Sequence, residues 1–154
     1  MDKIGKTQTV YNFKNTCHKC FNDIEFPLLG DFAYGEMIFQ TNDAKDFYIA
    51  VLIDNKIFDF ITKFLEHNKE FKNKKADPQK ILALIADRVE NKEFTTDYPI
   101  CPTCKSILRI FGDNIRTTKI ELSFATWTDF ESLTLDDKMK RLEEVVTLNS
   151  KILH

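Results

Sequence analysis

Two short cysteine motifs constrain this chain more than any other feature of its sequence. Residues 17–20 read Cys-His-Lys-Cys and residues 101–104 read Cys-Pro-Thr-Cys, and together they contain all four cysteines of the 154-residue chain. Two intervening residues let one tight turn direct both sulfurs at a single ion, and two such turns supply the four thiolates of a tetrahedral zinc site. We therefore predict that one Zn²⁺, or alternatively one iron ion, is bound by Cys17, Cys20, Cys101 and Cys104.

The separation of the motifs makes the predicted site a link between distant parts of the chain. Between Cys20 and Cys101 lie 80 residues, 21–100, whereas a self-contained zinc module usually has about 15–20 residues there. A shell of four sulfurs leaves the ion no open position for a substrate, so the predicted role of the metal is structural. Because the sulfurs complete the shell, we expect His18 to be exposed and uninvolved.

The motifs resemble the knuckles of zinc-ribbon and rubredoxin-like proteins, over the two four-residue turns and their neighbours. The resemblance implies that each turn carries two ligands of a shared metal. In many such knuckles a glycine follows the second cysteine, whereas Phe21 and Lys105 occupy those places in this chain. Since zinc with four thiolates carries a net negative charge, Lys19 and Lys105 are candidates to offset that charge, unless both simply point into water.

Composition and charge narrow the classes of function. The chain is 43% hydrophobic and 30% charged with a net charge of −2, which is typical of a globular protein long enough for one core. We expect residues 1–154 to form a single domain. A general nucleic-acid binder usually carries a basic face, so this class is disfavoured.

The sequence also indicates where the protein works. No apolar run approaches the roughly 20 residues that span a bilayer, and Met1–Gln8 lacks the apolar core of a signal peptide. We therefore expect a cytoplasmic protein with no membrane partner. In that compartment paired cysteines are more often metal-binding or catalytic than disulfide-bonded.

Hydrophobic periodicity predicts an α+β fold with a largely antiparallel sheet and about three helices, tied by the two knuckles. The continuous apolar run at 47–53 is expected to be a central strand buried on both faces. Pro27 lacks a backbone N–H and places its own strand at an edge. The last two predicted strands are expected to form a hairpin around residues 112–114. The predicted strands cover residues 8–14, 24–28, 34–41, 47–53, 107–111 and 115–126.

The predicted helices rest on short-range patterns of apolar and capping residues. Helical spacing of apolar residues predicts helices at about 55–70, from residue 78 and from residue 135. Asp54 or Asn55, Asp77 and Thr134 are the expected caps. One apolar stripe is predicted on the last helix, made of Leu135, Met139, Leu142, Val146 and Leu153.

Three further segments are candidate binding surfaces, each with a plainer alternative. The lysine-rich stretch Lys69–Lys75 could contact phosphates or could be a solvated loop. The turn Asp31–Glu36 could bind a partner or could simply pack its aromatic residues inward. In Trp127–Glu131, an exposed Trp could anchor a partner, or it could close the core beneath the last helix.

The sequence contains no recognisable catalytic constellation. Its four glycines form no phosphate-binding loop, and its three histidines lie in no HExxH motif. By elimination we predict a non-catalytic protein-interaction module with a protein partner, such as an adaptor or a bacterial immunity-type protein. The alternatives are a zinc-ribbon-type nucleic-acid binder and a redox or electron-transfer protein that uses the CxxC pairs. The partner's identity and the oligomeric state are not encoded in these patterns.

Overall fold

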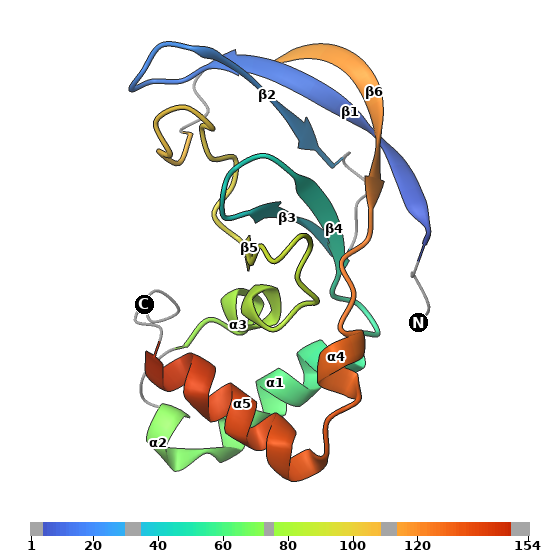
Figure 1. Cartoon of the computed structure of the whole chain (residues 1–154), viewed down its shortest axis with the longest axis vertical. Helices are drawn as coiled ribbons and strands as arrows, with labels where there is room; N and C mark the ends of the chain where they lie inside the picture. The colour runs from blue at the N-terminus through green and yellow to red at the C-terminus, as the bar shows by residue number, and fades with distance from the viewer. Residues whose placement is uncertain (1–4, 30–34, 73–75, 109–113, 149–154) are drawn as a thin grey trace.

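Three layers make up the fold in the computed structural model, which describes residues 5–29, 35–72, 76–108 and 114–148 (Figure 1). Within these residues the strands form two three-stranded antiparallel sheets. In Figure 1 one sheet arches over the other, and the helices lie below the second sheet. The predicted α+β class and its antiparallel pairing are confirmed.

The upper sheet has the order β2-β1-β6 and is formed by β1 (Thr7–Thr16), β2 (Asp23–Leu28) and β6 (Ile115–Ser123). As expected from Pro27, β2 lies at an edge. The register between β1 and β6 shifts between Tyr11 and Phe13. This irregularity lets Val10 and Phe13 both pack inward, although residues an odd number apart point to opposite faces of a regular strand.

Among the described residues, the ladder partner of β6 is not its predicted hairpin neighbour. Along its length β6 pairs with β1, from the opposite end of the chain. Of the expected hairpin partner at 107–111, only residues 107 and 108 are described, and Ile107 forms an isolated bridge with Ile100. The rest of the predicted partner and its turn, residues 109–113, lie outside the described residues.

The lower sheet has the order β4-β3-β5, with β3 (Glu36–Thr41), β4 (Phe47–Val51) and β5 (Phe94–Thr95). The prediction that 47–53 is the central strand is wrong, because β3 is central and β4 has one ladder partner in its sheet. Burial on both faces is confirmed. Ile49 packs among residues of the upper sheet, whereas the adjacent Ala50 packs in the helical core. A parallel bridge between Ile49 and Phe124 joins the two sheets.

In the part of the chain that the structure describes, the three predicted helices are present, together with two four-residue helices. The helices are α1 (Lys56–His67), α2 (Lys69–Lys72), α3 (Pro78–Leu84), α4 (Thr128–Glu131) and α5 (Leu135–Leu148). Asn55 accepts hydrogen bonds from two backbone N–H groups of α1, and Asp77 accepts one from α3. Thr134 accepts one from the N–H of Asp137. The lysine-rich stretch is therefore partly helical, while its residues 73–75 lie outside the described part.

The buried stripe of α5 begins later than the sequence predicts. Leu142 and Val146 are buried, but Leu135 and Met139 are 65% and 36% exposed, and Leu153 lies outside the described residues. Trp127 is 4% exposed, and its Nε1–H donates to the carbonyl of Leu82 at 2.9 Å. Its interpretation as a core residue is confirmed.

Candidate metal centre

The first knuckle is the turn that connects β1 to β2. The backbone N–H of Cys17 donates to the carbonyl of Asn22 at 2.9 Å, and the N–H of Phe21 donates back to the carbonyl of Cys17 at 3.0 Å. Thr16 and Asp23, the residues just outside the turn, face each other in the ladder of the two strands. These contacts fix the turn within the upper sheet.

The second knuckle repeats this geometry at the same offsets from its first cysteine. The N–H of Cys101 donates to the carbonyl of Ser106 at 2.8 Å, and the N–H of Lys105 donates to the carbonyl of Cys101 at 2.9 Å. A bridge between Ile100 and Ile107 closes the turn. Two segments with little sequence in common thus form the same ligand-presenting turn.

The missing glycines do not change the backbone of either knuckle. Phe21 and Lys105 both have a φ of 61°, in the left-handed region that glycine adopts without cost. A residue with a Cβ is disfavoured there by roughly 1 kcal/mol or more. The hydrogen bonds of each turn hold these two residues in that conformation.

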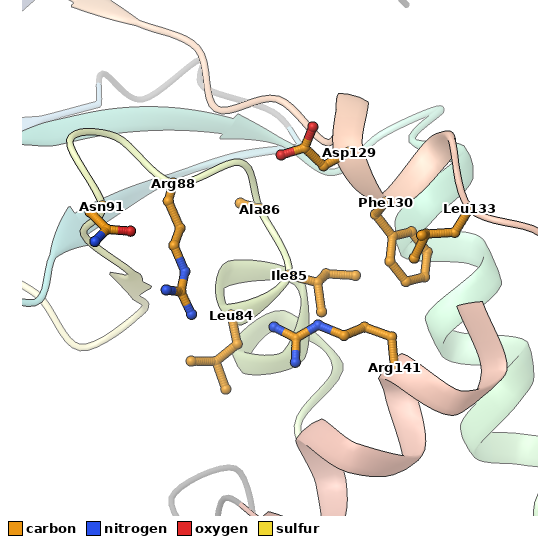
Figure 2. Close-up of a pocket in the computed structure, with 9 residues that line it drawn as sticks. All are labelled: Leu84, Ile85, Ala86, Arg88, Asn91, Asp129, Phe130, Leu133 and Arg141. Carbon is orange, nitrogen blue, oxygen red and sulfur yellow. The ribbon is translucent and has the colours of Figure 1, made fainter. Parts of the chain in front are cut away.

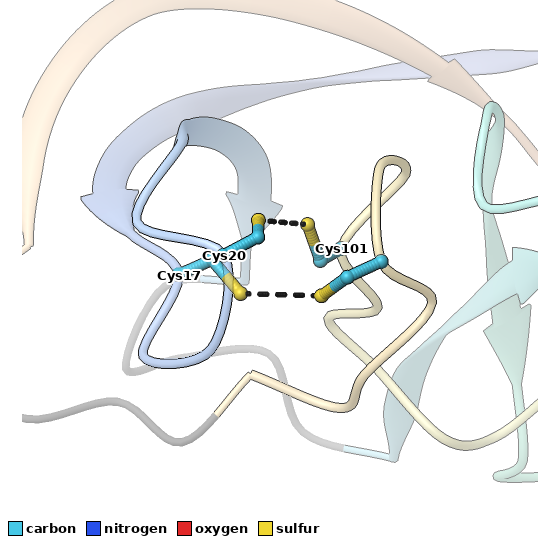
Figure 3. A group of neighbouring side chains, drawn as sticks. Cys17, Cys20 and Cys101 are labelled. Carbon is cyan, nitrogen blue, oxygen red and sulfur yellow. Dashed lines mark hydrogen bonds between the residues drawn. The ribbon is translucent and has the colours of Figure 1, made fainter.

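The knuckles bring all four sulfurs together, as the sequence predicts (Figure 3). Each Sγ lies within 4.8 Å of the other three. The Cys17 and Cys104 sulfurs are 3.6 Å apart, and those of Cys20 and Cys101 are 3.5 Å apart. A tetrahedron with metal–sulfur bonds of about 2.3 Å has sulfur–sulfur edges of about 3.8 Å, while a disulfide measures about 2.0 Å. The spacing fits four-coordinate metal binding, and all four cysteines are free of disulfides.

The site is buried on one side and open on the other. The first cysteine of each knuckle, Cys17 or Cys101, is fully buried and packs with Ile24, Phe26 and Leu108. The second cysteine is less enclosed, since Cys20 is partly buried and Cys104 is exposed. A metal here would lie at the edge of a small apolar cluster.

Polar groups favour the thiolate form at two of the sulfurs, those of Cys17 and Cys104. The backbone N–H groups of Cys20 and Lys19 lower the pKa of Cys17. The hydroxyl and the N–H of Ser106 lower the pKa of Cys104 to about 6. The N–H of Asn22 acts in the same direction on Cys20, but burial and the neighbouring thiols outweigh it and raise the pKa of Cys20 to about 11.

Asn22 and Ser106 were missed as site residues by the sequence analysis. Each lies five positions after the first cysteine of its knuckle, and each directs its side chain at the sulfur of the second cysteine. The Asn22 amide donates to the Cys20 sulfur at 3.4 Å. Aligning the two motifs with each other would reveal this shared polar position.

Gln40 was also missed, although it fixes the second knuckle to the lower sheet. Its side chain is fully buried in β3. Oε1 accepts from the N–H of Ile100 at 2.8 Å, while Nε2 donates at 3.2 Å to the carbonyls of Ile100 and Ala44. The side-chain amide thus pairs with Ile100 as a neighbouring strand would.

Contacts beyond the knuckles place the site between the sheets. The Tyr98 hydroxyl donates to the carbonyl of Pro27 in β2 at 2.7 Å, and burial raises the pKa of this phenol. Lys105, a candidate to offset thiolate charge, donates through Nζ to the carbonyl of Asp43 at 2.7 Å, while Lys19 is exposed. Because one knuckle belongs to the upper sheet and the other is held on the lower one, a shared metal would join the two.

His18 differs in part from its predicted exposure. The residue is partly buried, and its Nδ1 is buried without a hydrogen-bond partner among the described residues. The imidazole is not a member of the four-sulfur group. Its predicted lack of a ligand role is consistent with this geometry.

The predicted turn Asp31–Glu36 is described only in part. Residues 31–34 of the turn Asp31–Glu36 lie outside the described residues. At Gly35, φ is +72°, and an added Cβ would lie 2.7 Å from the Ile53 Cβ, so this position requires glycine.

In the described ranges, no helix is both long and apolar enough to cross a bilayer.

Comparison of the chain with protein-family models, with curated proteins and with solved structures finds no match.

Proposed function

We propose that this protein binds one structural Zn²⁺ through Cys17, Cys20, Cys101 and Cys104. The observation that carries the proposal is the convergence of four sulfurs, from knuckles separated by 80 residues, to within 4.8 Å of one another. Elemental analysis of untagged protein tests it, with one zinc per chain expected. A red protein containing iron would favour the rubredoxin-like alternative, and a metal-free protein would contradict both.

The role of this zinc is to hold the two sheets against each other. Four thiolates complete its coordination shell, which leaves no position for a substrate. The N–H groups of the knuckles and the side chains of Asn22 and Ser106 stabilise the sulfur charge, as outer partners do at other metal sites. The metal's contribution is therefore to folding rather than to catalysis.

We further propose that the protein is a non-catalytic, cytoplasmic interaction module with a protein partner, such as an adaptor or a bacterial immunity-type protein. Phe21 supports this proposal because it is 76% exposed at the first knuckle, and exposed aromatic side chains often anchor protein contacts. Affinity capture from the native cell with the wild-type protein and with Phe21→Ala tests it. A partner recovered by the wild type and lost by the variant is the expected result.

One surface supports the nucleic-acid alternative. On the upper sheet, the Arg116 guanidinium lies 4.2 Å from the centre of the Tyr11 ring, and the Lys119 ammonium lies 5.5 Å from it. Cations beside an exposed aromatic ring can bind a phosphate backbone and stack a base. Salt-sensitive RNA or DNA binding that Arg116→Gln weakens would favour this function over the protein-interaction module.

The redox alternative rests on Cys104, which is exposed and has a pKa lowered to about 6 by Ser106. Thiols that cycle between reduced and disulfide forms, in a protein that carries no metal as purified, would favour it.

A further inference from the structure

A pocket on the helical side of the molecule is separate from the cysteine site (Figure 2). Its volume is about 520 Å³, within the range that holds a small organic ligand. The end of α3 and the segment after it form one side, while α4, the following turn and α5 form the other. Its apolar wall consists of Leu84, Ile85, Ala86, Phe130 and Leu133.

Two arginines from distant parts of the sequence meet at this pocket. Figure 2 shows the side chains of Arg88, after α3, and Arg141, on α5, entering the pocket from its two sides, and Leu84 and Ile85 line the same pocket. The chain contains 4 arginines against 18 lysines. Two of the three arginines in the described part of the chain therefore line one pocket, in a protein whose net charge is −2.

Both guanidinium groups keep donors available for a ligand. Arg88 uses Nη2 in an ion pair with Glu93 at 3.0 Å, and Arg141 lies 4.0 Å from Glu144. Their side chains remain 48% and 40% exposed. Neither glutamate lines the pocket, and a guanidinium carries several N–H groups besides the one in each pair.

We propose that this pocket binds a small organic oxyanion. Arg88 and Arg141 hold its phosphate or carboxylate group, and Ile85 and Phe130, which are 6% and 3% exposed, contact its apolar body. Arginine suits this task because its planar fork matches two oxygens of such a group. The site goes beyond the proposed metal function and does not depend on it.

Substitution of Asp129 should change the anion affinity of the pocket in the opposite direction to substitution of either arginine. Among the described residues that line the pocket, it is the one carboxylate, and in Figure 2 that carboxylate points away from both guanidinium groups. A bound anion would still feel its repulsion across a partly solvated space. Asp129→Asn should therefore tighten anion binding, whereas neutralising either arginine should weaken it.

The experiment is a titration of ¹⁵N-labelled, metal-loaded protein with phenyl phosphate, followed by amide chemical shifts. Benzoate and uncharged benzyl alcohol are the comparison probes and separate the two oxyanions from the apolar body alone. We expect saturable shifts at the pocket amides, and binding of the neutral probe that is at least about tenfold weaker. Arg88→Gln and Arg141→Gln should each weaken anion binding by at least about tenfold, and Asp129→Asn should tighten it roughly two- to fivefold.

The control is Lys6→Gln, which removes an exposed cation just before β1, outside the pocket lining, and should leave the titration unchanged. The absence of saturable shifts at the pocket up to roughly 10 mM of both anionic probes would overturn the proposal. Equal binding of phenyl phosphate and benzyl alcohol by the wild type would also overturn it. That comparison needs no substitution and so stands even if an arginine variant fails to fold.

Discussion

Removing the proposed zinc should cost the protein a large part of its stability. The metal would close a loop containing the 80 residues between Cys20 and Cys101. Treated as a cross-link, closure of a loop of this length is worth roughly 4.5 kcal/mol in lost entropy of the unfolded chain. The total stability of a domain is about 5–15 kcal/mol, so the loss would be a substantial fraction of the whole.

The loss should be visible as a fall in melting temperature. In a domain of about 150 residues, each kcal/mol moves Tm by roughly 2–4 °C, which predicts a fall of about 10–20 °C after chelation. Circular dichroism under reducing conditions measures the melting, and elemental analysis measures the zinc. Cys20→Ser should reduce both quantities. The matched control is Thr103→Ser, which alters an exposed residue of the second knuckle without removing a sulfur.

Two results would refute this reasoning. The first is a chelated protein that has lost its zinc and still melts within about 2 °C of the loaded form, since loop closure by the metal would then contribute almost nothing to stability. The second is a Cys20→Ser variant with unchanged metal content and melting temperature. Either outcome would mean that the four sulfurs do not fasten the two sheets.

Three further predictions concern residues around the site. Gln40→Met should lower the free energy of unfolding in urea by about 1–3 kcal/mol, because the N–H and carbonyl of Ile100 lose their partner. Phe21→Gly should raise it by roughly 0.5–1 kcal/mol, whereas Phe21→Ala, which keeps a Cβ at positive φ, should not. Lys92 lowers the pKa of Asp43, so this carboxylate stabilises the fold above its unfolded pKa of about 3.9, and that stability is lost as the pH falls further. Asp43→Asn should therefore destabilise the protein at pH 7, by an amount that shrinks toward zero in urea titrations below about pH 4.

Features that depend on neighbouring residues were predicted well from the sequence. The caps at Asn55, Asp77 and Thr134 lie where the polar residue precedes an apolar helical pattern, because capping is a contact over two or three positions. Pro27 placed its strand at an edge for an equally local reason, the absence of an N–H.

Features that depend on contacts between distant segments were not predicted well from the sequence. The run of β4 is apolar because it lies between two layers, and the same pattern would suit a central strand. The partner of β6 is β1, from the other end of the sequence, and alternation along a strand does not specify its neighbour. Leu135 and Met139 fit the helical period of α5, but the core does not extend to the start of that helix.

The cysteine site also combines features that could be predicted from local sequence with features that depend on distant segments. The convergence of its four cysteines could be predicted because thiolate chemistry restricts both the residue type and the spacing of a metal site. Gln40 could not, since a buried glutamine in a strand becomes a support only when a distant chain segment lies beside it. Asn22 and Ser106 could be predicted in part. Their shared offset from the first cysteine is visible in the sequence, but their contact with the second sulfur follows only from the structure of the turn.

Phe21 and Lys105 show why a departure from a family pattern need not remove the structure behind it. Both residues take the left-handed backbone that many knuckles assign to glycine. The strain costs roughly 1–3 kcal/mol at each position, while binding of a structural zinc by small zinc-finger peptides contributes about 10–16 kcal/mol. Metal binding of that strength would outweigh the strain at both positions, and the hydrogen bonds from Phe21 to Cys17 and from Lys105 to Cys101 fix the geometry. The ligand spacing and the turn that it closes therefore define the motif more strongly than its glycine does.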